Sequence, residues 1–228
     1  IFHNDIVTSV NFENKPFLSK TESGKDFLSK SIIIATGAQA RWLNIESEKK
    51  FKGFGISACA TCDGFFFKDQ KVIVVGGGNS AVEEAIFLTK FASKVILVHR
   101  RDKLRAEKIL QDRLFNNKNI EVIWNSKVVD FLGEENPKAL KQVVLENIKD
   151  GSKTKIEANG AFIAIGHDPA TSLFKDKLDM DNENYIITKG DSTETSIKGV
   201  FAAGDVKDKV YRQAVTAAGM GCMAALEA

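Results

Sequence analysis

Residues 71–85 read KVIVVGGGNSAVEEA, and this stretch decides the fold class. The β-branched run from Lys71 to Val75 is typical of a strand that is buried on both faces. Three glycines follow, and apolar residues then recur at helical spacing from Asn79 to Ala92. A second apolar run, Val95 to Val98, predicts another strand. A strand, a glycine turn, a helix and a strand within about 30 residues make a βαβ unit, which predicts an α/β fold of the Rossmann type.

The glycine turn has the spacing of a dinucleotide-binding site, Gly76-x-Gly78-x-x-Ala81. The first glycine makes the tight turn, the second lets the backbone approach a pyrophosphate, and the third small residue permits close packing of helix and strand. The helix that begins at Asn79 adds free N–H groups and the positive end of its dipole. The alternative is a glycine-rich turn without a ligand, and the flanking strand and helix disfavour it.

The residues at the end of the second strand indicate which dinucleotide binds. An enzyme that uses NAD places Asp or Glu there, whereas this strand is followed by His99, Arg100 and Arg101, with Arg105 one turn later. Guanidinium groups bind the 2′-phosphate of NADP through paired, charge-assisted hydrogen bonds, so we expect NADPH rather than NADH. The alternatives are a solvated basic segment or a nucleic-acid patch. A net charge of only +2 argues against a general nucleic-acid binder, and we expect no nucleic-acid partner.

Two cysteines three positions apart, Cys59 and Cys62, form a second candidate site. Such a pair can close a small-loop disulfide and exchange it with another dithiol, and Asp63 could relay protons. The alternatives are half of a zinc site or two inert buried thiols. Zinc is usually held by two such pairs, and the only other candidate ligands of this kind are Cys222 and three scattered histidines (His3, His99, His167). We expect Cys222, in a stretch rich in Ala and Gly, to be a buried small apolar residue.

The composition excludes several classes of protein. Of the 228 residues, 43% are hydrophobic and 27% are charged, which is ordinary for a globular protein and disfavours disorder. Three cysteines are too few for a secreted scaffold stapled by disulfides. No apolar run approaches the roughly 18 residues that span a bilayer and no signal peptide is visible, so we expect no membrane partner.

Further predicted elements flank these motifs. A buried strand at 199–203 ends in Gly204-Asp205 and leads to a helix over 210–225. An Asp at a strand end can accept hydrogen bonds from a ribose or ribityl hydroxyl, although Asp after Gly is also a common turn residue. A helix is expected at 106–115 and a meander of strands at 121–124, 128–132, 142–147 and 153–156. The remaining strands are expected at 5–12, 16–20, 30–36 and 161–165, with the run at 30–36 buried on both faces.

Taken together, these motifs resemble the low-molecular-weight thioredoxin reductases. The resemblance follows the family's order along nearly the whole chain: SIIIATGA (31–38), CATCDG (59–64), VVGGGNSAVEEA (74–85), VHRRDKLRAEK (98–108), AIGHDP (164–169), GVFAAGDV (199–206) and YRQAVTAAGMGCMAA (211–225). The position of CATC just ahead of the NADPH turn separates this family from enzymes similar to glutathione reductase, whose cysteines lie in the FAD domain. It also separates the family from the ferredoxin–NADP reductases, because these lack the pair.

The resemblance implies a fold of two Rossmann-like, three-layer ββα domains, with the NADPH domain inserted in the FAD domain. We expect an NADPH domain at 41–167 between two pieces of an FAD domain, 1–40 and 168–228. It also implies that NADPH reduces FAD, that FAD reduces the Cys59–Cys62 disulfide, and that the dithiol reduces thioredoxin. By this analogy the enzyme is a cytoplasmic homodimer whose NADPH domain rotates against its FAD domain.

The same resemblance implies roles for individual residues. Cys62 would face the flavin, Cys59 would attack thioredoxin, and Asp63 would be the acid or base. The NADPH-binding residues would be Gly76, Gly78, Asn79, Ser80, Ala81, His99, Arg100, Arg101 and Arg105. The FAD-binding residues would be Thr36, Gly37, Asp205, Arg212, Gln213 and Ala214.

One departure from the family pattern is large. Family members begin with a glycine fingerprint for FAD, whereas Gly24 is the only glycine here before Gly37. We therefore expect that about the first third of a family member is absent, that the last helix stops early, and that Ile1 lies inside a longer enzyme. Two alternatives remain at this point: the flavoprotein reductase of an alkyl hydroperoxide system, or a truncated, non-catalytic NADP-binding module.

Overall fold

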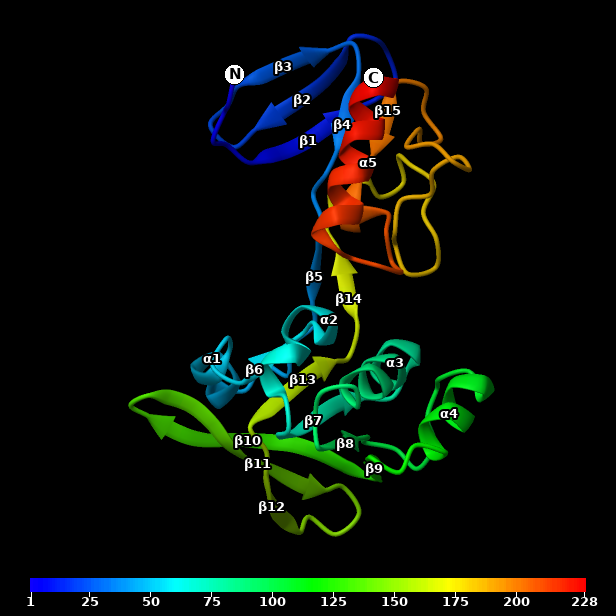
Figure 1. Cartoon of the computed structure of the whole chain (residues 1–228). Helices are drawn as coiled ribbons and strands as arrows, with labels where there is room; N and C mark the ends of the chain where they lie inside the picture. Colours follow the sequence, from blue (N-terminus) through cyan, green and yellow to red (C-terminus); the bar gives the residue numbers. More distant parts are fainter. The chain divides into compact units, whose positions relative to one another are not determined.

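The computed structural model describes residues 1–228 as two compact units (Figure 1). One unit comprises residues 1–39 and 167–228, and the other comprises residues 40–166. Where the chain passes between the units, β5 (Ala38–Ala40) pairs with β14 (His167–Pro169). The identity of these units as an FAD domain and an NADPH domain stays a prediction.

The unit of residues 40–166 is built on a five-stranded parallel sheet. The strand order is β6-β13-β7-β8-β9, and every neighbouring pair is parallel. The βαβ unit predicted from 71–98 is confirmed, because β7 pairs in parallel with β8 across α3. The strands are β6 (Ile56–Ser57), β7 (Lys71–Gly76), β8 (Lys94–Val98), β9 (Ile120–Ile123) and β13 (Gly160–Ala164).

Alternation along the central strands places two cores on opposite faces of this sheet. Val72 and Val74 of β7 pack with α3 (Asn79–Leu88) and α4 (Lys108–Phe115), whereas Ile73 and Val75 pack with α1 (Glu46–Phe51) and an antiparallel sheet. That sheet comprises β10 (Ser126–Glu135), β11 (Lys138–Asn147) and β12 (Lys153–Glu157). The expected three-layer ββα arrangement is confirmed.

Some boundaries differ from the predictions. The segment 121–124 is not part of the meander: β9 follows α4, which acts as a crossover and returns the chain parallel to β8. α3 ends at Leu88 rather than at residue 92. The sequence does not predict α1, because this helix has only six residues and buries only Glu48 and Phe51.

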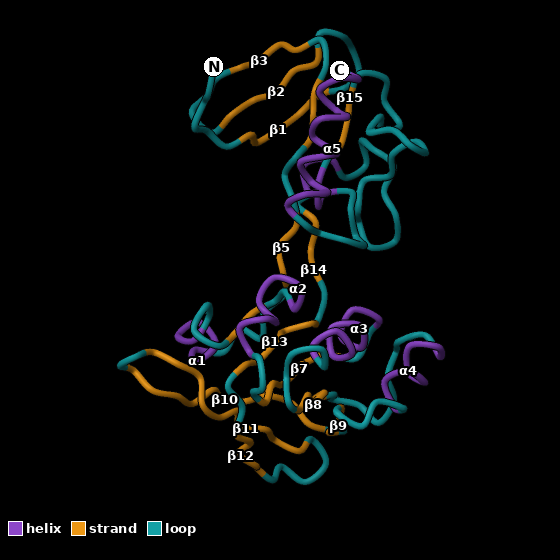
Figure 2. The backbone as a smooth tube through the Cα atoms, viewed as in Figure 1, coloured by secondary structure: helices purple, strands orange, loops and turns teal.

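The unit of residues 1–39 and 167–228 contains two small sheets. β1 (Val7–Asn11), β2 (Phe17–Thr21) and β3 (Asp26–Ser29) are antiparallel, and β4 (Ile32–Ile34) pairs in parallel with β15 (Val200–Ala202). β15 is fully buried, as predicted, but Ile33 of β4 is 41% exposed, so burial of the 30–36 strand on both faces is wrong. Between β14 and β15 the chain is almost entirely loop and turn (Figure 2), with one 3₁₀ turn, η2 (Ser172–Phe174).

The last helix, α5 (Ala214–Glu227), begins later than the predicted residue 210. Arg212 has a φ of 49° and Gln213 is extended, so neither residue can continue a helix backwards. Met220 and Ala224 pack on Phe201 and Ala203, whereas Cys222 lies between them in sequence and therefore on another face of the helix. Cys222 is exposed, and its expected burial is wrong. No helix of the chain combines the length and the apolar character that crossing a membrane requires.

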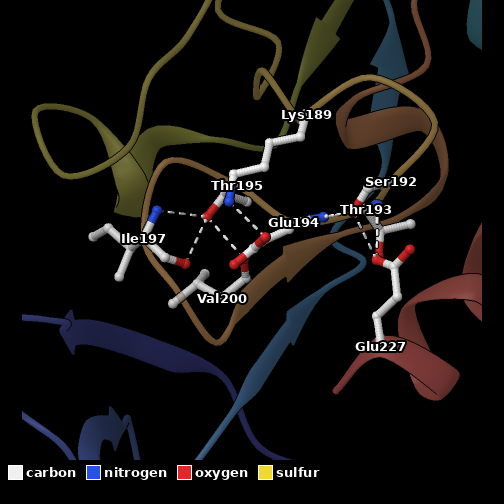
Figure 3. Close-up of polar contacts among 8 residues, drawn as sticks. All are labelled: Lys189, Ser192, Thr193, Glu194, Thr195, Ile197, Val200 and Glu227. Carbon is white, nitrogen blue, oxygen red and sulfur yellow. Dashed lines mark hydrogen bonds and ion pairs between the residues drawn. The ribbon is translucent and has the colours of Figure 1, made fainter.

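A single carboxylate fixes the end of α5 (Figure 3). Oε2 of Glu227 accepts hydrogen bonds from the Thr193 N–H at 2.9 Å, the Thr193 hydroxyl at 2.6 Å and the Ser192 hydroxyl at 3.0 Å. In the same loop the buried Thr195 hydroxyl donates to the Val200 carbonyl oxygen at 2.8 Å. Side-chain hydrogen bonds therefore order this loop where strands do not.

Candidate functional site

The predicted cysteine pair is a disulfide. Cys59 and Cys62 are joined at the start of the short helix α2 (Ala60–Asp63). Cys59 is the N-cap of this helix, and its Sγ accepts the Cys62 N–H at 3.2 Å, as a serine or aspartate oxygen does at other helix starts. Cys59 is half-buried and Cys62 is exposed, so an external thiol can reach the pair. No group of three or more His, Cys, Asp or Glu side chains is placed to hold a metal ion.

A serine that the sequence reasoning did not single out lies within this loop. The Ser57 hydroxyl donates to Oδ2 of Asp63 at 2.6 Å and accepts the Cys59 N–H at 3.0 Å. Its position two residues before the first cysteine is the signal that could have identified it, because serine commonly caps a turn that follows. The structure thus brings Asp63 into one hydrogen-bonded loop with Cys59.

The glycine turn follows β7 as predicted, but its first two glycines are required for packing. A Cβ at Gly76 would lie 2.3 Å from the Ala164 carbonyl oxygen and 2.6 Å from the Ala81 Cβ. A Cβ at Gly77 would lie 2.2 Å from the His99 ring, whereas a Cβ at Gly78 would meet nothing within 4 Å. None of the three has a left-handed φ. Gly78 is the N-cap of α3 and the open position of the turn.

The loop that carries the arginines is bonded to this turn. The His99 side chain is 5% exposed, and its Nδ1 and Nε2 lie 2.8 Å and 2.9 Å from the carbonyl oxygens of Gly76 and Lys103. The Arg105 N–H donates to the Gly77 carbonyl oxygen at 2.7 Å. Asn79 Oδ1 accepts the N–H of Glu107 at 2.9 Å. The backbone segment that carries the exposed residues Arg100, Arg101 and Arg105 is therefore anchored beside the glycine turn, with the His99 ring beneath it.

A third set of predicted site residues lies in the unit that contains α5. Thr36 and Gly37 follow β4, and the Thr36 hydroxyl donates to the Ala170 carbonyl oxygen at 2.7 Å. Asp205 lies in the 3₁₀ turn η3 (Gly204–Val206), which one residue separates from β15. Burial, and then the negative charge of Asp208, raise the pKa of Asp205. Gln213 is the N-cap of α5.

Asp208, which the sequence reasoning missed, shapes the segment before α5. Its carboxylate accepts the N–H groups of Val210, Tyr211 and Arg212 at 2.9–3.1 Å and the Thr216 hydroxyl at 3.2 Å. Burial acts to raise the pKa of Asp208, but these hydrogen bonds outweigh it and hold the pKa below its ordinary value. An Asp two to four residues before a turn is a weak signal, because many such residues are solvated.

A parallel sheet with a dinucleotide turn and a disulfide in the same unit is the arrangement of a pyridine nucleotide-disulphide oxidoreductase. The family model with that description matches residues 1–221. Among curated relatives, the thioredoxin reductase of Rickettsia conorii is 58% identical over 224 residues, which cover 98% of this chain and 72% of the relative. Thioredoxin reductase 2 of Arabidopsis thaliana is 49% identical over 230 residues, covering 98% and 60%.

Solved structures agree with these relatives. The thioredoxin reductase from Giardia duodenalis superposes with a TM-score of 0.93 at 42% identity, covering 97% of this chain and 72% of that one. The enzyme from Streptococcus pyogenes gives a TM-score of 0.90 at 45% identity, covering 97% and 71%. The chain belongs to the pyridine nucleotide-disulphide oxidoreductases and, within them, to the thioredoxin reductases. The resemblance inferred from the sequence is confirmed; the roles of individual residues stay predictions.

Proposed function

We propose that the chain is an NADPH-dependent thioredoxin-disulfide reductase, in which electrons pass from NADPH through FAD and the Cys59–Cys62 disulfide to thioredoxin. The observation that supports this most is the disulfide itself, which opens a helical turn in the same unit as the glycine turn. When both cofactors are bound, NADPH supplies the hydride, and FAD passes its electrons on to the disulfide. Residues 41–167 would form the NADPH domain, and residues 1–40 and 168–228 would belong to the FAD domain.

The glycine turn fits an NADP-type dinucleotide. Gly78 leaves open space at the start of α3, where free N–H groups and the helix dipole favour a pyrophosphate. The three exposed arginines supply the positive charge that a 2′-phosphate needs. We assign the pyrophosphate to Gly76, Gly78, Asn79, Ser80 and Ala81, and the 2′-phosphate to Arg100, Arg101 and Arg105. The buried His99 ring would support the turn from beneath through its contact with the Gly76 carbonyl oxygen.

The residues predicted to hold FAD also fit their group. Burial raises the pKa of Asp205, and a hydroxyl donor from a ribose or ribityl chain would stabilise this carboxylate. The Arg212 and Gln213 backbone precedes α5 in a conformation that Asp208 holds in place. We assign FAD contacts to Thr36, Gly37, Asp205, Arg212, Gln213 and Ala214.

The geometry of the loop supports a route for the disulfide exchange. In the reduced chain the Cys62 N–H is placed to stabilise a thiolate on Cys59, which attacks one sulfur of the thioredoxin disulfide. As the Cys59 thiol ionises, its proton passes to the Asp63 carboxylate; the thioredoxin S–S bond breaks, and the leaving thiolate takes that proton from Asp63. The Cys62 thiol then gives its proton to Asp63 and attacks Cys59 Sγ. The Cys59–Cys62 bond forms as the mixed disulfide with thioredoxin breaks, and the second thioredoxin thiolate takes this proton, which completes the dithiol.

A protein partner is supported by the surface next to the disulfide. Phe65 and Phe66, in the 3₁₀ turn η1 (Gly64–Phe67) that follows α2, are 67% and 72% exposed. Exposed adjacent aromatic side chains commonly mark sites of protein contact. We further propose a cytoplasmic homodimer, an assignment that rests on the family resemblance.

The test is NADPH-dependent reduction of oxidised thioredoxin by the chain supplied with FAD. Cys59→Ser and Cys62→Ser should each abolish reduction, whereas Cys222→Ser, at an exposed cysteine outside the disulfide, should keep it. A visible spectrum should show a flavin band near about 450 nm, as expected for FAD. NADPH binding without a flavin band or turnover would instead support a non-catalytic NADP-binding module.

A further inference from the structure

The hydroxyl of Ser57 connects the two chemical parts of the redox loop. It donates to Oδ2 of Asp63 at 2.6 Å and accepts the Cys59 N–H at 3.0 Å. The Ser57 hydroxyl proton lies toward Oδ2 of Asp63, and the Ser57 lone pairs remain for the Cys59 N–H. One side chain therefore sets the distance between the carboxyl and the first cysteine.

Both ends of this connection are anchored by backbone structure. Ser57 is the last residue of β6, where it pairs with Phe162 of β13, and its neighbour Ile56 is 2% exposed. Asp63 is the last residue of α2, and its N–H donates to the Cys59 carbonyl oxygen at 3.1 Å. The Ser57 hydroxyl thus bridges the end of a sheet strand and the helical turn that contains both cysteines.

None of the hydrogen bonds of the Ser57 hydroxyl involves a sulfur atom. When the Cys59–Cys62 bond is reduced, the covalent link across α2 is lost, but the Ser57 contacts to the Cys59 N–H and to Asp63 remain available. The bond to Oδ2 also leaves Oδ1 of Asp63 for a proton. We propose that Ser57 is a positioning residue, whose hydroxyl holds the Asp63 carboxyl in the loop of the reduced cysteines so that Oδ1 takes the proton of the attacking thiol and passes it to the leaving thiolate.

This inference rests on the proposed function of Asp63 as the acid, and its test needs no cofactor. The full chain is reduced, freed of reductant and mixed with oxidised thioredoxin, and the loss of its thiols is followed in a single turnover. Because general acid catalysis typically contributes 10²–10⁴-fold, we expect Ser57→Ala to slow exchange by about tenfold and Ser57→Thr, which keeps the hydroxyl, to stay within about twofold of the parent.

A second substrate separates positioning from mere support of the loop. An aromatic disulfide such as dithiobis(nitrobenzoate) releases a thiolate of low pKa that leaves without a proton. Its exchange rate should therefore be unchanged in Ser57→Ala, whereas a loosened loop would slow both substrates. Ser47→Ala is the matched control, because Ser47 in α1 also accepts a backbone N–H at 3.0 Å, from Phe131, but lies outside the Cys59–Asp63 loop. It should leave both rates unchanged.

A double-mutant comparison distinguishes failure of this inference from failure of the function on which it rests. Asp63→Ala should slow exchange with thioredoxin, and Ser57→Ala should add no further loss in that background. A parent-like rate in Ser57→Ala beside a slow Asp63→Ala would overturn the role of Ser57 alone. A parent-like rate in Asp63→Ala would overturn the acid assignment and the Ser57 inference with it.

Discussion

Replacement of Gly77 by Ala tests how the dinucleotide turn is held. The added Cβ would lie 2.2 Å from Cε1 and Nδ1 of the His99 ring, a distance at which one of the two must move. The ring is 5% exposed, and carbonyl oxygens of Gly76 and Lys103 hold both of its nitrogens, so it cannot turn aside freely. The substitution should therefore displace the ring and weaken the hydrogen bond that its N–H donates to one of these oxygens.

The expected loss of stability follows from these contacts. Overpacking costs about 1–3 kcal/mol and the weakened hydrogen bond about 1 kcal/mol, so the free energy of unfolding should fall by about 3 kcal/mol. At about 3 °C per kcal/mol for a unit of this size, the Tm should fall by ~10 °C. Thermal unfolding followed by circular dichroism measures this change.

Two further variants control the experiment. Gly78→Ala should keep the Tm, because a Cβ there meets nothing within 4 Å and its backbone angles of −94° and −175° suit alanine. It should nevertheless weaken NADPH binding, since the Cβ enters the space proposed for the pyrophosphate. In a His99→Ala background, Gly77→Ala should cost much less, because the clashing ring is gone. If the Tm of Gly77→Ala lies within about 2 °C of the parent Tm, the packing argument is refuted.

Three other predictions follow from charged groups. Arg100→Ala combined with Arg101→Ala should raise the KM for NADPH far more than for NADH, and equal effects would refute the 2′-phosphate assignment. Because the pKa of Asp208 is depressed in the folded chain, its contribution to stability is complete above the unfolded value of about 4 and is lost as pH falls below it. Asp208→Asn should therefore lower the Tm at pH 7 and flatten its acid dependence; an unaltered profile would contradict this. Glu227→Gln should speed hydrogen exchange at the Thr193 amide without changing NADPH affinity, and unchanged exchange would count against the anchoring of α5.

Several features of the candidate site could be predicted because they depend on short stretches of chain. The β-branched run of β7, the glycines after it and the apolar spacing of α3 specify a βαβ unit locally. The spacing of Cys59 and Cys62 is one helical turn, so their pairing needs no distant partner. The turn, the basic strand end and the cysteine pair were accordingly all identified from the sequence.

Other features could not be predicted because they depend on neighbours that are far away in sequence. Cys222 and Ile33 are apolar and occur in apolar stretches, yet both are exposed, since the exposure of a side chain depends on what packs against it. The 121–124 segment has the pattern of a meander strand, but its place after α4 assigns it to the parallel sheet.

The sequence by itself determined the fold class, the family, the dinucleotide turn and the redox pair, because periodicity, turn residues and residue spacing act over a few positions. Only the tertiary structure decided what each polar side chain bonds. It placed the His99 ring beneath Gly77 and made Ser57 the link between Asp63 and Cys59. It also placed the Asp208 carboxylate where it accepts backbone N–H groups just before α5. Hydrogen-bond partners depend on which groups lie close together in space. A local sequence pattern does not specify this for residues that are far apart in the chain.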